Sequence, residues 1–149
     1  FQNDSNKIFE GIIKVDDIID ITICNPPFHA SKKEALENSR QKVRNLTGEY
    51  HKSPTLNFSG VSDELIYKGG ERQFIQNMIK ESVRYANNCV WFSTLVSKKN
   101  NLRGIYSNLK TLKARQIKEI AIGTANKKSR IIAWTFMTKT EKKYKKNTE

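Results

Sequence analysis

Two adjacent prolines directly follow a run of β-branched residues, and this junction constrains the fold more than any other feature of the sequence. The run "DIIDITIC" covers residues 17–24 and is long enough for a strand but too short for a helix. Because Pro26 and Pro27 lack backbone N–H donors and have a restricted φ, the strand must end before them. We therefore expect a buried strand that leads into a stiff turn, Asn25-Pro26-Pro27-Phe28, with one amide side chain and one aromatic ring.

The rest of the chain alternates between helical and extended apolar patterns. Helical spacing predicts helices over residues 32–43, 71–86 and 100–112, and the first of them begins with a capping box, Ser31-x-x-Glu34. Apolar or alternating runs predict strands over residues 88–96, 115–123 and 129–137. From about residue 44 to residue 70 the pattern is lost, which indicates a long loop. The order predicts an α/β domain with a parallel sheet and an antiparallel pair of strands at its edge.

The net charge of +12 is concentrated in the last third of the chain. Residues 98–149 contain 15 Lys and Arg but only 3 Glu, whereas the two signs balance over residues 1–97. A one-sided basic surface attracts polyanions, and RNA or DNA is the usual partner. Residues 139–149 are mostly lysine and other polar residues, so we expect a frayed basic tail behind a domain that spans residues 1–138.

Composition also excludes several kinds of protein. No run of about 18 apolar residues is present, and the N-terminus lacks the pattern of a signal peptide. Cys24 and Cys89 lie in apolar runs and are expected to be reduced thiols. No His, Cys, Asp or Glu cluster has metal-site spacing. We expect a metal-free, cytoplasmic monomer, and because the chain begins with Phe1 we interpret it as a piece of a longer protein.

The Asn-Pro-Pro-Phe turn suits the chemistry of an aromatic amino group. Such a nitrogen, for example N6 of adenine, is a poor nucleophile, and acceptors placed on both of its N–H bonds expose its lone pair. The side-chain oxygen of Asn25 can accept one of these bonds and the carbonyl of Pro26 the other. The prolines, Pro26 and Pro27, hold that carbonyl rigidly, as pre-organised catalysis requires. Phe28 offers a face on which a flipped-out base can stack.

Longer motifs make a resemblance specific. The stretches "CNPPFHAS", "RNL", "LNFSG", "GGE-x-x-FI-x-x-MI-x-ES", "WFSTLVSKKNNL" and "SRIIAWTF" resemble those of the bacterial large-subunit (23S) ribosomal RNA adenine-N6 methyltransferases. The resemblance extends from about Ile8 to Met137. Eukaryotic methyltransferase-like enzymes that act on structured RNA are related to this family.

The resemblance implies the fold and the partners. It implies a Rossmann-like class I methyltransferase fold, of which this chain would form the second half of the sheet, with S-adenosylmethionine as cofactor and large-subunit ribosomal RNA as substrate. Asn25 would contact the cofactor as well as the substrate. The family's main cofactor motif is a Gly-rich turn upstream, whereas Gly11 stands alone here. We therefore expect the C-terminal portion of the enzyme, inactive and poor at binding cofactor by itself.

Basic residues near predicted strand and helix ends are the candidates for RNA contact. The carboxyl ends of parallel strands share one edge of a sheet, where ligands bind. We assign RNA binding to seven residues that follow strands, flank the last strand turn or lie in the irregular stretch after the turn: Lys42, Arg44, Lys98, Lys99, Lys127, Lys128 and Arg130.

Two alternatives stay open at this stage. The same turn could serve a DNA adenine or a protein glutamine methyltransferase, although the basic last third argues against a protein substrate. The chain could also be a basic RNA-binding module without chemistry, in which Asn25 and Pro26 merely end a strand.

Overall fold

The computed structural model describes residues 7–31, 33–34, 66–123 and 129–146. The chain divides into two compact units, one made of residues 1–26 and 75–149 and the other of residues 27–74. The larger unit contains the sheet and most of the described helices, and the smaller unit contains the start of helix α2.

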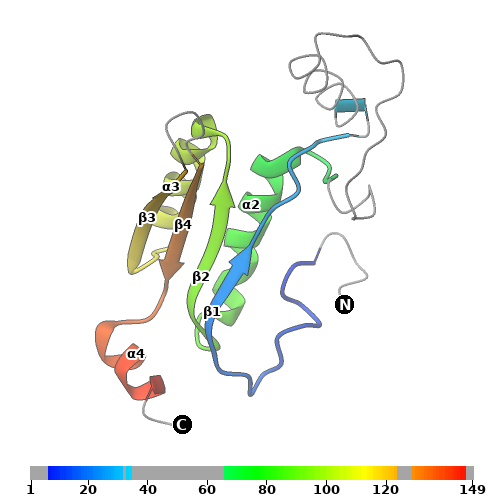
Figure 1. Ribbon diagram of the computed structural model, residues 1–149. Helices are drawn as coiled ribbons and strands as arrows, with labels where there is room; N and C mark the ends of the chain where they lie inside the picture. Colours follow the sequence, from blue (N-terminus) through cyan, green and yellow to red (C-terminus); the bar gives the residue numbers. More distant parts are fainter. Residues whose placement is uncertain (1–6, 32, 35–65, 124–128, 147–149) are drawn as a thin grey trace. The chain divides into compact units, whose positions relative to one another are not determined.

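A four-stranded mixed sheet forms the larger unit (Figure 1). Its strands are β1 (Ile19–Cys24), β2 (Cys89–Val96), β3 (Gln116–Ile122) and β4 (Ser129–Thr135). They lie in the order β1-β2-β4-β3, with β1 parallel to β2 and with β4 antiparallel to both of its neighbours. The predicted α/β sheet with an antiparallel edge pair is therefore confirmed.

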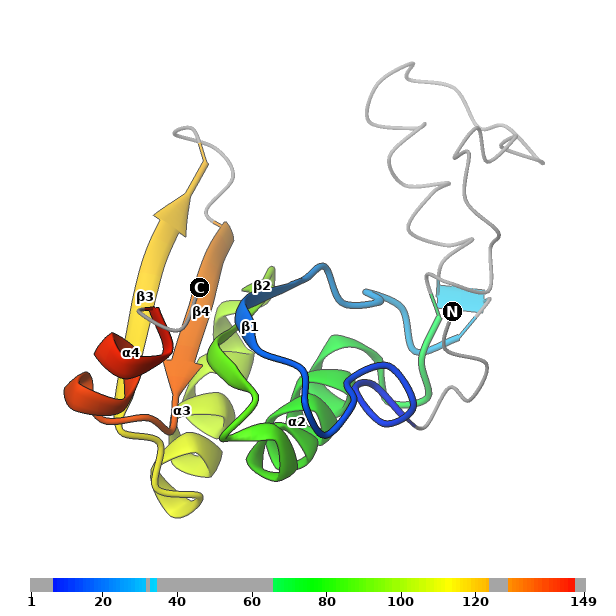
Figure 2. The ribbon, with the colours of Figure 1, turned by 90° about the horizontal axis from the view of Figure 1, so that it is seen from below.

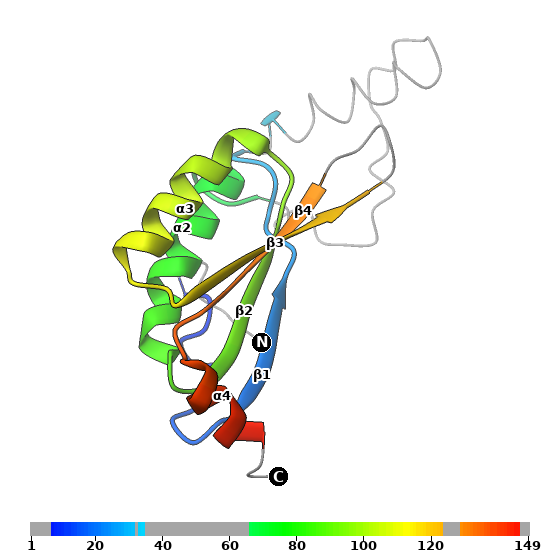
Figure 3. The same cartoon turned by 90° about the vertical axis from the view of Figure 1, so that its left-hand side faces the viewer.

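Helices α2 (Gly70–Ser82) and α3 (Leu102–Thr111) cover one face of this sheet (Figure 2 and Figure 3). Short 3₁₀ turns follow α2 at Val83–Tyr85 and precede α3 at Lys99–Asn101. The indole N–H of Trp134 donates a hydrogen bond of 3.0 Å to the hydroxyl of Ser82. Between helices and sheet lies a core of fully or almost fully buried side chains, which includes Ile75, Met78, Ile79, Phe92, Val96, Ile105, Leu109, Ile132 and Trp134.

Strand β1 is not buried as we expected. It is an edge strand, paired only with β2 among the described strands, and the side chains of Ile21 and Ile23 are 49% and 80% exposed. A run of β-branched residues indicates a strand, but it does not show whether the faces of that strand are covered.

Residues 139–146 form helix α4 (Lys139–Lys146) rather than the frayed tail that the composition suggests. Thr138 and Glu141 make a capping box, in which the N–H of Glu141 donates to the Thr138 hydroxyl at 3.2 Å and the N–H of Thr138 donates to the Glu141 carboxylate at 2.6 Å. The Lys145 ammonium donates to the carbonyl of Asn87, just before β2. Helix α4 therefore lies at the end of the sheet where β1 and β2 begin (Figure 1).

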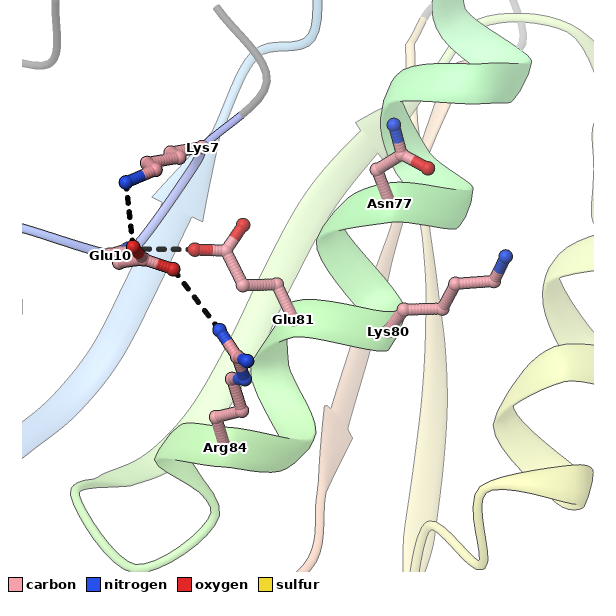
Figure 4. Close-up of a pocket in the computed structure, with 6 residues that line it drawn as sticks. All are labelled: Lys7, Glu10, Asn77, Lys80, Glu81 and Arg84. Atoms are coloured by element: carbon pink, nitrogen blue, oxygen red, sulfur yellow. Dashed lines mark hydrogen bonds and ion pairs between the residues drawn. The ribbon is translucent and has the colours of Figure 1, made fainter. Parts of the chain in front are cut away.

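The N-terminal segment is fastened to the end of α2 by one carboxylate (Figure 4). The Glu81 side chain accepts hydrogen bonds from the backbone N–H groups of Ile8, Phe9 and Glu10, at 2.9, 2.8 and 2.7 Å. A carboxylate that accepts several backbone N–H bonds is a strong local constraint. This contact fixes the chain ahead of β1.

Candidate active site

Asn25 and Pro26 lie where β1 ends. The last register pair of the two parallel strands joins Cys24 to Thr94, so the chain leaves the sheet at the predicted place. Asn25 is exposed, whereas Pro26 is fully buried. A buried proline holds the backbone of the turn in place, and the exposed amide beside it is free to meet a ligand.

Pro27 and Phe28 begin the smaller unit, and both are half-buried. After them, His29 forms a parallel β-bridge with Ile66, and the N–H of Tyr67 donates to the carbonyl of His29 at 3.0 Å. This bridge joins the segment after the turn to the segment that leads into α2. Stacking of a base on Phe28 stays a prediction.

The predicted capping box after the turn is present with one change. The N–H of Glu34 donates to the hydroxyl of Ser31 at 3.2 Å, as expected. The Glu34 carboxylate, however, accepts from the N–H of Ala30 at 2.7 Å rather than from that of Ser31. Residues 33 and 34 are helical, and the rest of the helix predicted over residues 32–43 falls outside the described residues.

Two glycines form the turn that leads into α2. Gly69 and Gly70 have φ values of +88° and +62°, which residues with a side chain rarely adopt. A Cβ at Gly69 would also lie 2.6 Å from the Cβ of Gln73. The pair therefore serves as the turn before a helix that the sequence predicts.

Three of the predicted RNA-contact residues lie at the same end of the sheet as Asn25, where β1 and β2 terminate. Lys98 and Lys99 follow β2, whose carboxyl end lies beside that of β1 because the two strands are parallel. Arg130 is the second residue of β4 and pairs with Val96, the last residue of β2. The other four, Lys42, Arg44, Lys127 and Lys128, lie outside the described residues.

Arg130 is already engaged within the protein. Its Nε lies 3.2 Å from Oε1 of Glu119, and its side chain is only 11% exposed. The Tyr106 hydroxyl donates to Oε2 of the same carboxylate at 2.6 Å. Burial and the contact with Glu119 raise the pKa of Tyr106 to about 12. Sequence reasoning missed this network; the one available signal was an acidic residue on a strand in a strongly basic region.

The cysteines are free thiols, as expected. Cys89 is fully buried, and burial raises the pKa of its thiol to about 11. Cys24 is half-buried, and burial raises the pKa of its thiol as well. Within the described ranges, no group of three or more His, Cys, Asp and Glu side chains could hold a metal ion, and no helix is long and apolar enough to cross a membrane. Metal-free chemistry stays a prediction.

A polar surface pocket of about 420 Å³ lies elsewhere (Figure 4). Its lining residues come from the N-terminal segment, from the second half of α2 and from the 3₁₀ turn after it: Lys7, Glu10, Asn77, Lys80, Glu81 and Arg84. Both carboxylates are engaged, Glu81 with the backbone and Glu10 with Lys7 at 2.6 Å and Arg84 at 3.0 Å. The pocket is therefore a place where polar contacts attach the N-terminal segment to α2 and the turn after it, and we do not consider it a candidate active site.

Comparisons with known proteins identify the family. Residues 1–138 match a family described as RNA methyltransferase. The Ribosomal RNA large subunit methyltransferase F of Shewanella woodyi is 47% identical over 153 residues, which cover 95% of this chain and 40% of that protein. The protein of the same name from Bacteroides thetaiotaomicron is 48% identical over 136 residues, covering 91% of this chain and 44% of that protein. The chain thus spans less than half the length of these curated relatives.

Solved structures agree on the fold. The human Mettl16 catalytic domain, crystallised with the MAT2A 3'UTR hairpin 1, matches with a TM-score of 0.63 and 23% identity over 83% of this chain and 41% of that one. The human methyltransferase 10 domain containing protein matches with a TM-score of 0.58 and 18% identity over 92% of this chain and 46% of that one. These likenesses confirm the Rossmann-like class I methyltransferase fold. With nearly its whole length matched by the family, the chain belongs to the RNA methyltransferase family.

Proposed function

We propose that this chain is the catalytic portion of an S-adenosylmethionine-dependent enzyme that methylates N6 of an adenosine in large-subunit ribosomal RNA. The observation that carries the proposal is the turn at the end of β1, where an exposed Asn25 follows a parallel strand and precedes a buried Pro26. In open α/β sheets, ligands bind outside the carboxyl ends of the strands. The names of the curated relatives support ribosomal RNA as the substrate.

The residues of the turn would act on the amino group of the target base. The Asn25 side-chain oxygen accepts one N–H bond of N6 and the Pro26 carbonyl accepts the other, which directs the nitrogen lone pair toward the methyl donor. Phe28 stacks on the ring and holds the flipped base. When bound, S-adenosylmethionine would supply an electrophilic methyl group, which would pass from its sulfur to N6. The surplus proton would pass from N6 to water afterwards, so the chain needs no charged base for the transfer.

The cofactor fits this chain only in part. The exposed amide of Asn25 is available for a hydrogen bond to it, and no other described residue is assigned to it. We propose that a segment preceding residue 1 in the full-length protein supplies the rest of the cofactor site and pairs with the open edge of β1. Among the described strands β1 pairs only with β2, so its other edge is open to such a segment. The exposed Ile21 and Ile23 offer apolar surface that the same segment would cover. The greater length of the relatives also supports it.

Calorimetric titration tests this division of the site. S-adenosylmethionine is titrated into the chain as given and into the full-length protein. We expect binding by the full-length protein alone. Tight binding by the isolated chain would show that the cofactor site has been misplaced, and the absence of binding by both would count against a methyltransferase.

Methyl acceptance then identifies the substrate. The full-length protein is incubated with labelled cofactor and with 23S ribosomal RNA, duplex DNA or a release-factor-like protein, and the product is digested and analysed for N6-methyladenosine. Label in ribosomal RNA alone is the expected result. Label in DNA or on a protein glutamine would favour the corresponding rival enzyme.

We also propose that the enzyme acts without a metal, as a monomer, and in the cytoplasm, where bacterial ribosomal RNA is found.

A further inference from the structure

A dense group of cations lies at the end of the sheet opposite Asn25. The sequence of α4, "KTEKKYKK", holds five lysines and one glutamate, and basic residues at the start of β3 lie beside it. The one carboxylate of α4, Glu141, accepts the capping bond from Thr138 and also attracts Arg115. We call this group the α4 cationic surface and define it as Arg115, Lys118, Lys139, Lys142, Lys143 and Lys145.

Trp91 brings two of these lysines together. The ammonium group of Lys142 lies 4.2 Å from the centroid of the indole ring, and that of Lys118 lies 4.8 Å from the same centroid. Lys142 also donates a hydrogen bond of 2.5 Å to the side chain of Gln116. A cation over an aromatic face is held by the ring quadrupole, so both charges are fixed in place although they repel each other.

The fold leaves these charges poorly neutralised. Within the described part of the chain, none of the six cations forms an ion pair. Burial, followed by repulsion from Lys118 and Lys139, lowers the pKa of Lys142. A polyanion laid over the surface would relieve this repulsion and would release its own counterions.

The sheet sets the distance between this surface and the turn. Strand β2 has eight residues, and at about 3.3 Å per residue it is about 26 Å long. Helix α4 lies at the start of β2, whereas Asn25 lies beside its end. A ligand that meets both must therefore be extended, which a structured RNA is and a single nucleotide is not.

We propose that the α4 cationic surface is a second RNA-binding surface, which holds the phosphate backbone of the substrate about 25 Å from the adenosine that is methylated. This inference rests on the proposed function. A membrane is a poorer partner, because a helix that binds lipid needs a broad apolar face and α4 has only Tyr144 among its eight residues.

A charge-removing double variant of the full-length protein tests the proposal. Lys139→Gln/Lys143→Gln removes two exposed charges and keeps the Lys142 contact with Trp91. Lys139→Arg/Lys143→Arg keeps the charge at the same positions. Lys80→Gln/Lys110→Gln removes two charges from exposed positions on α2 and α3 and serves as the matched control. For each protein, the Kd for 23S ribosomal RNA is measured between 50 and 200 mM salt, roughly the range over which phosphate contacts show their salt dependence, and kcat and KM for methylation are measured alongside.

The proposal predicts a selective loss of RNA affinity. For the Gln pair at 139 and 143, Kd and KM should rise about tenfold and the salt slope should fall by about 1–2, with kcat unchanged. The Arg pair and the α2/α3 control should stay within about twofold of the wild-type protein. Equal behaviour of the two Gln pairs would overturn the proposal. Binding of the same proteins to phosphatidylserine vesicles is measured as well. If the Gln pair at 139 and 143 loses vesicle binding but keeps its Kd for RNA, the proposal is also overturned.

The wild-type protein separates this inference from the proposed function. If it binds 23S ribosomal RNA without methylating it, the proposed function fails while the Kd values still decide the role of the surface. If it methylates the RNA and the two Gln pairs behave alike, only the α4 cationic surface loses its assignment. If it does not bind the RNA at all, both are wrong.

Discussion

Replacing Ser82 by Ala leaves the indole N–H of Trp134 buried without a partner. Both residues are fully buried, and the Ser82 hydroxyl accepts from the indole at 3.0 Å while donating to the carbonyl of Ile79 at 2.7 Å. An unsatisfied buried donor costs about 1–3 kcal/mol, and the better helix propensity of Ala returns a few tenths of a kcal/mol. We therefore expect Ser82→Ala to lower the free energy of unfolding by about 2 kcal/mol, or Tm by about 4–8 °C.

A double-mutant cycle isolates the hydrogen bond from other effects of the substitution. Ser82→Ala is made in the wild-type protein and in a Trp134→Phe background, and unfolding of the full-length protein is followed by urea titration. In the Phe background no indole N–H is left unsatisfied, so Ser82→Ala should cost less than about 1 kcal/mol there. An equal cost in the two backgrounds would refute the reasoning, because it would show that the stability lost in Ser82→Ala does not come from the hydrogen bond between Ser82 of α2 and Trp134 of β4.

Three further predictions concern groups outside the core. Glu81→Ala removes the acceptor of three backbone N–H groups and should lower the free energy of unfolding by about 2 kcal/mol, with faster proteolysis of the N-terminal segment; unchanged Tm and cleavage would contradict this. The Tyr106 pKa is raised to about 12, so its bond to Glu119 should stabilise the fold fully below about pH 10 and lose that effect as pH rises toward 12. The stability gap between wild type and Tyr106→Phe should therefore close over that range, and a constant gap would argue against it. Cys24, half-buried, should react with a thiol reagent at pH 8 before the fully buried Cys89 does, as peptide mass mapping would show; the reverse order would contradict the burial.

The periodic elements were predictable because their signals are local. Apolar residues recur at helical spacing over residues 70–82, and Ile75, Met78 and Ile79 are all buried as expected. The predicted helix runs on to residue 86, however, whereas the α-helix ends at Ser82 and is followed by a 3₁₀ turn in which Val83 is 39% exposed. The end of β1 was fixed equally well by Pro26 and Pro27, which cannot donate to a sheet.

The features that were missed depend on residues far apart in the sequence. The exposure of β1 depends on which segments pack against it, which the apolar content of the strand does not reveal. Trp91 belongs to the apolar run that predicts a strand over residues 88–96, but it is half-buried beneath Lys118 and Lys142, which come from two other elements. Helix α4 did carry a local signal, the capping box that begins at Thr138, but its low apolar content outweighed that signal. Which side chains surround the target base stays a prediction for the same reason.

The turn at the end of β1 is tested most directly by Asn25→Ala in the full-length protein, with Asn87→Ala as the same change at an exposed position away from the turn. The rate of N6-methyladenosine formation in 23S ribosomal RNA is measured under single-turnover conditions, together with the Kd for the RNA. If Asn25 polarises the amino group, its loss should slow methyl transfer by about 10²–10³-fold, as removal of one pre-organised hydrogen-bonding group does elsewhere. The Kd should stay within about twofold, and Asn87→Ala should behave as wild type. An Asn25→Ala protein that methylates at the wild-type rate would contradict the catalytic role of the turn.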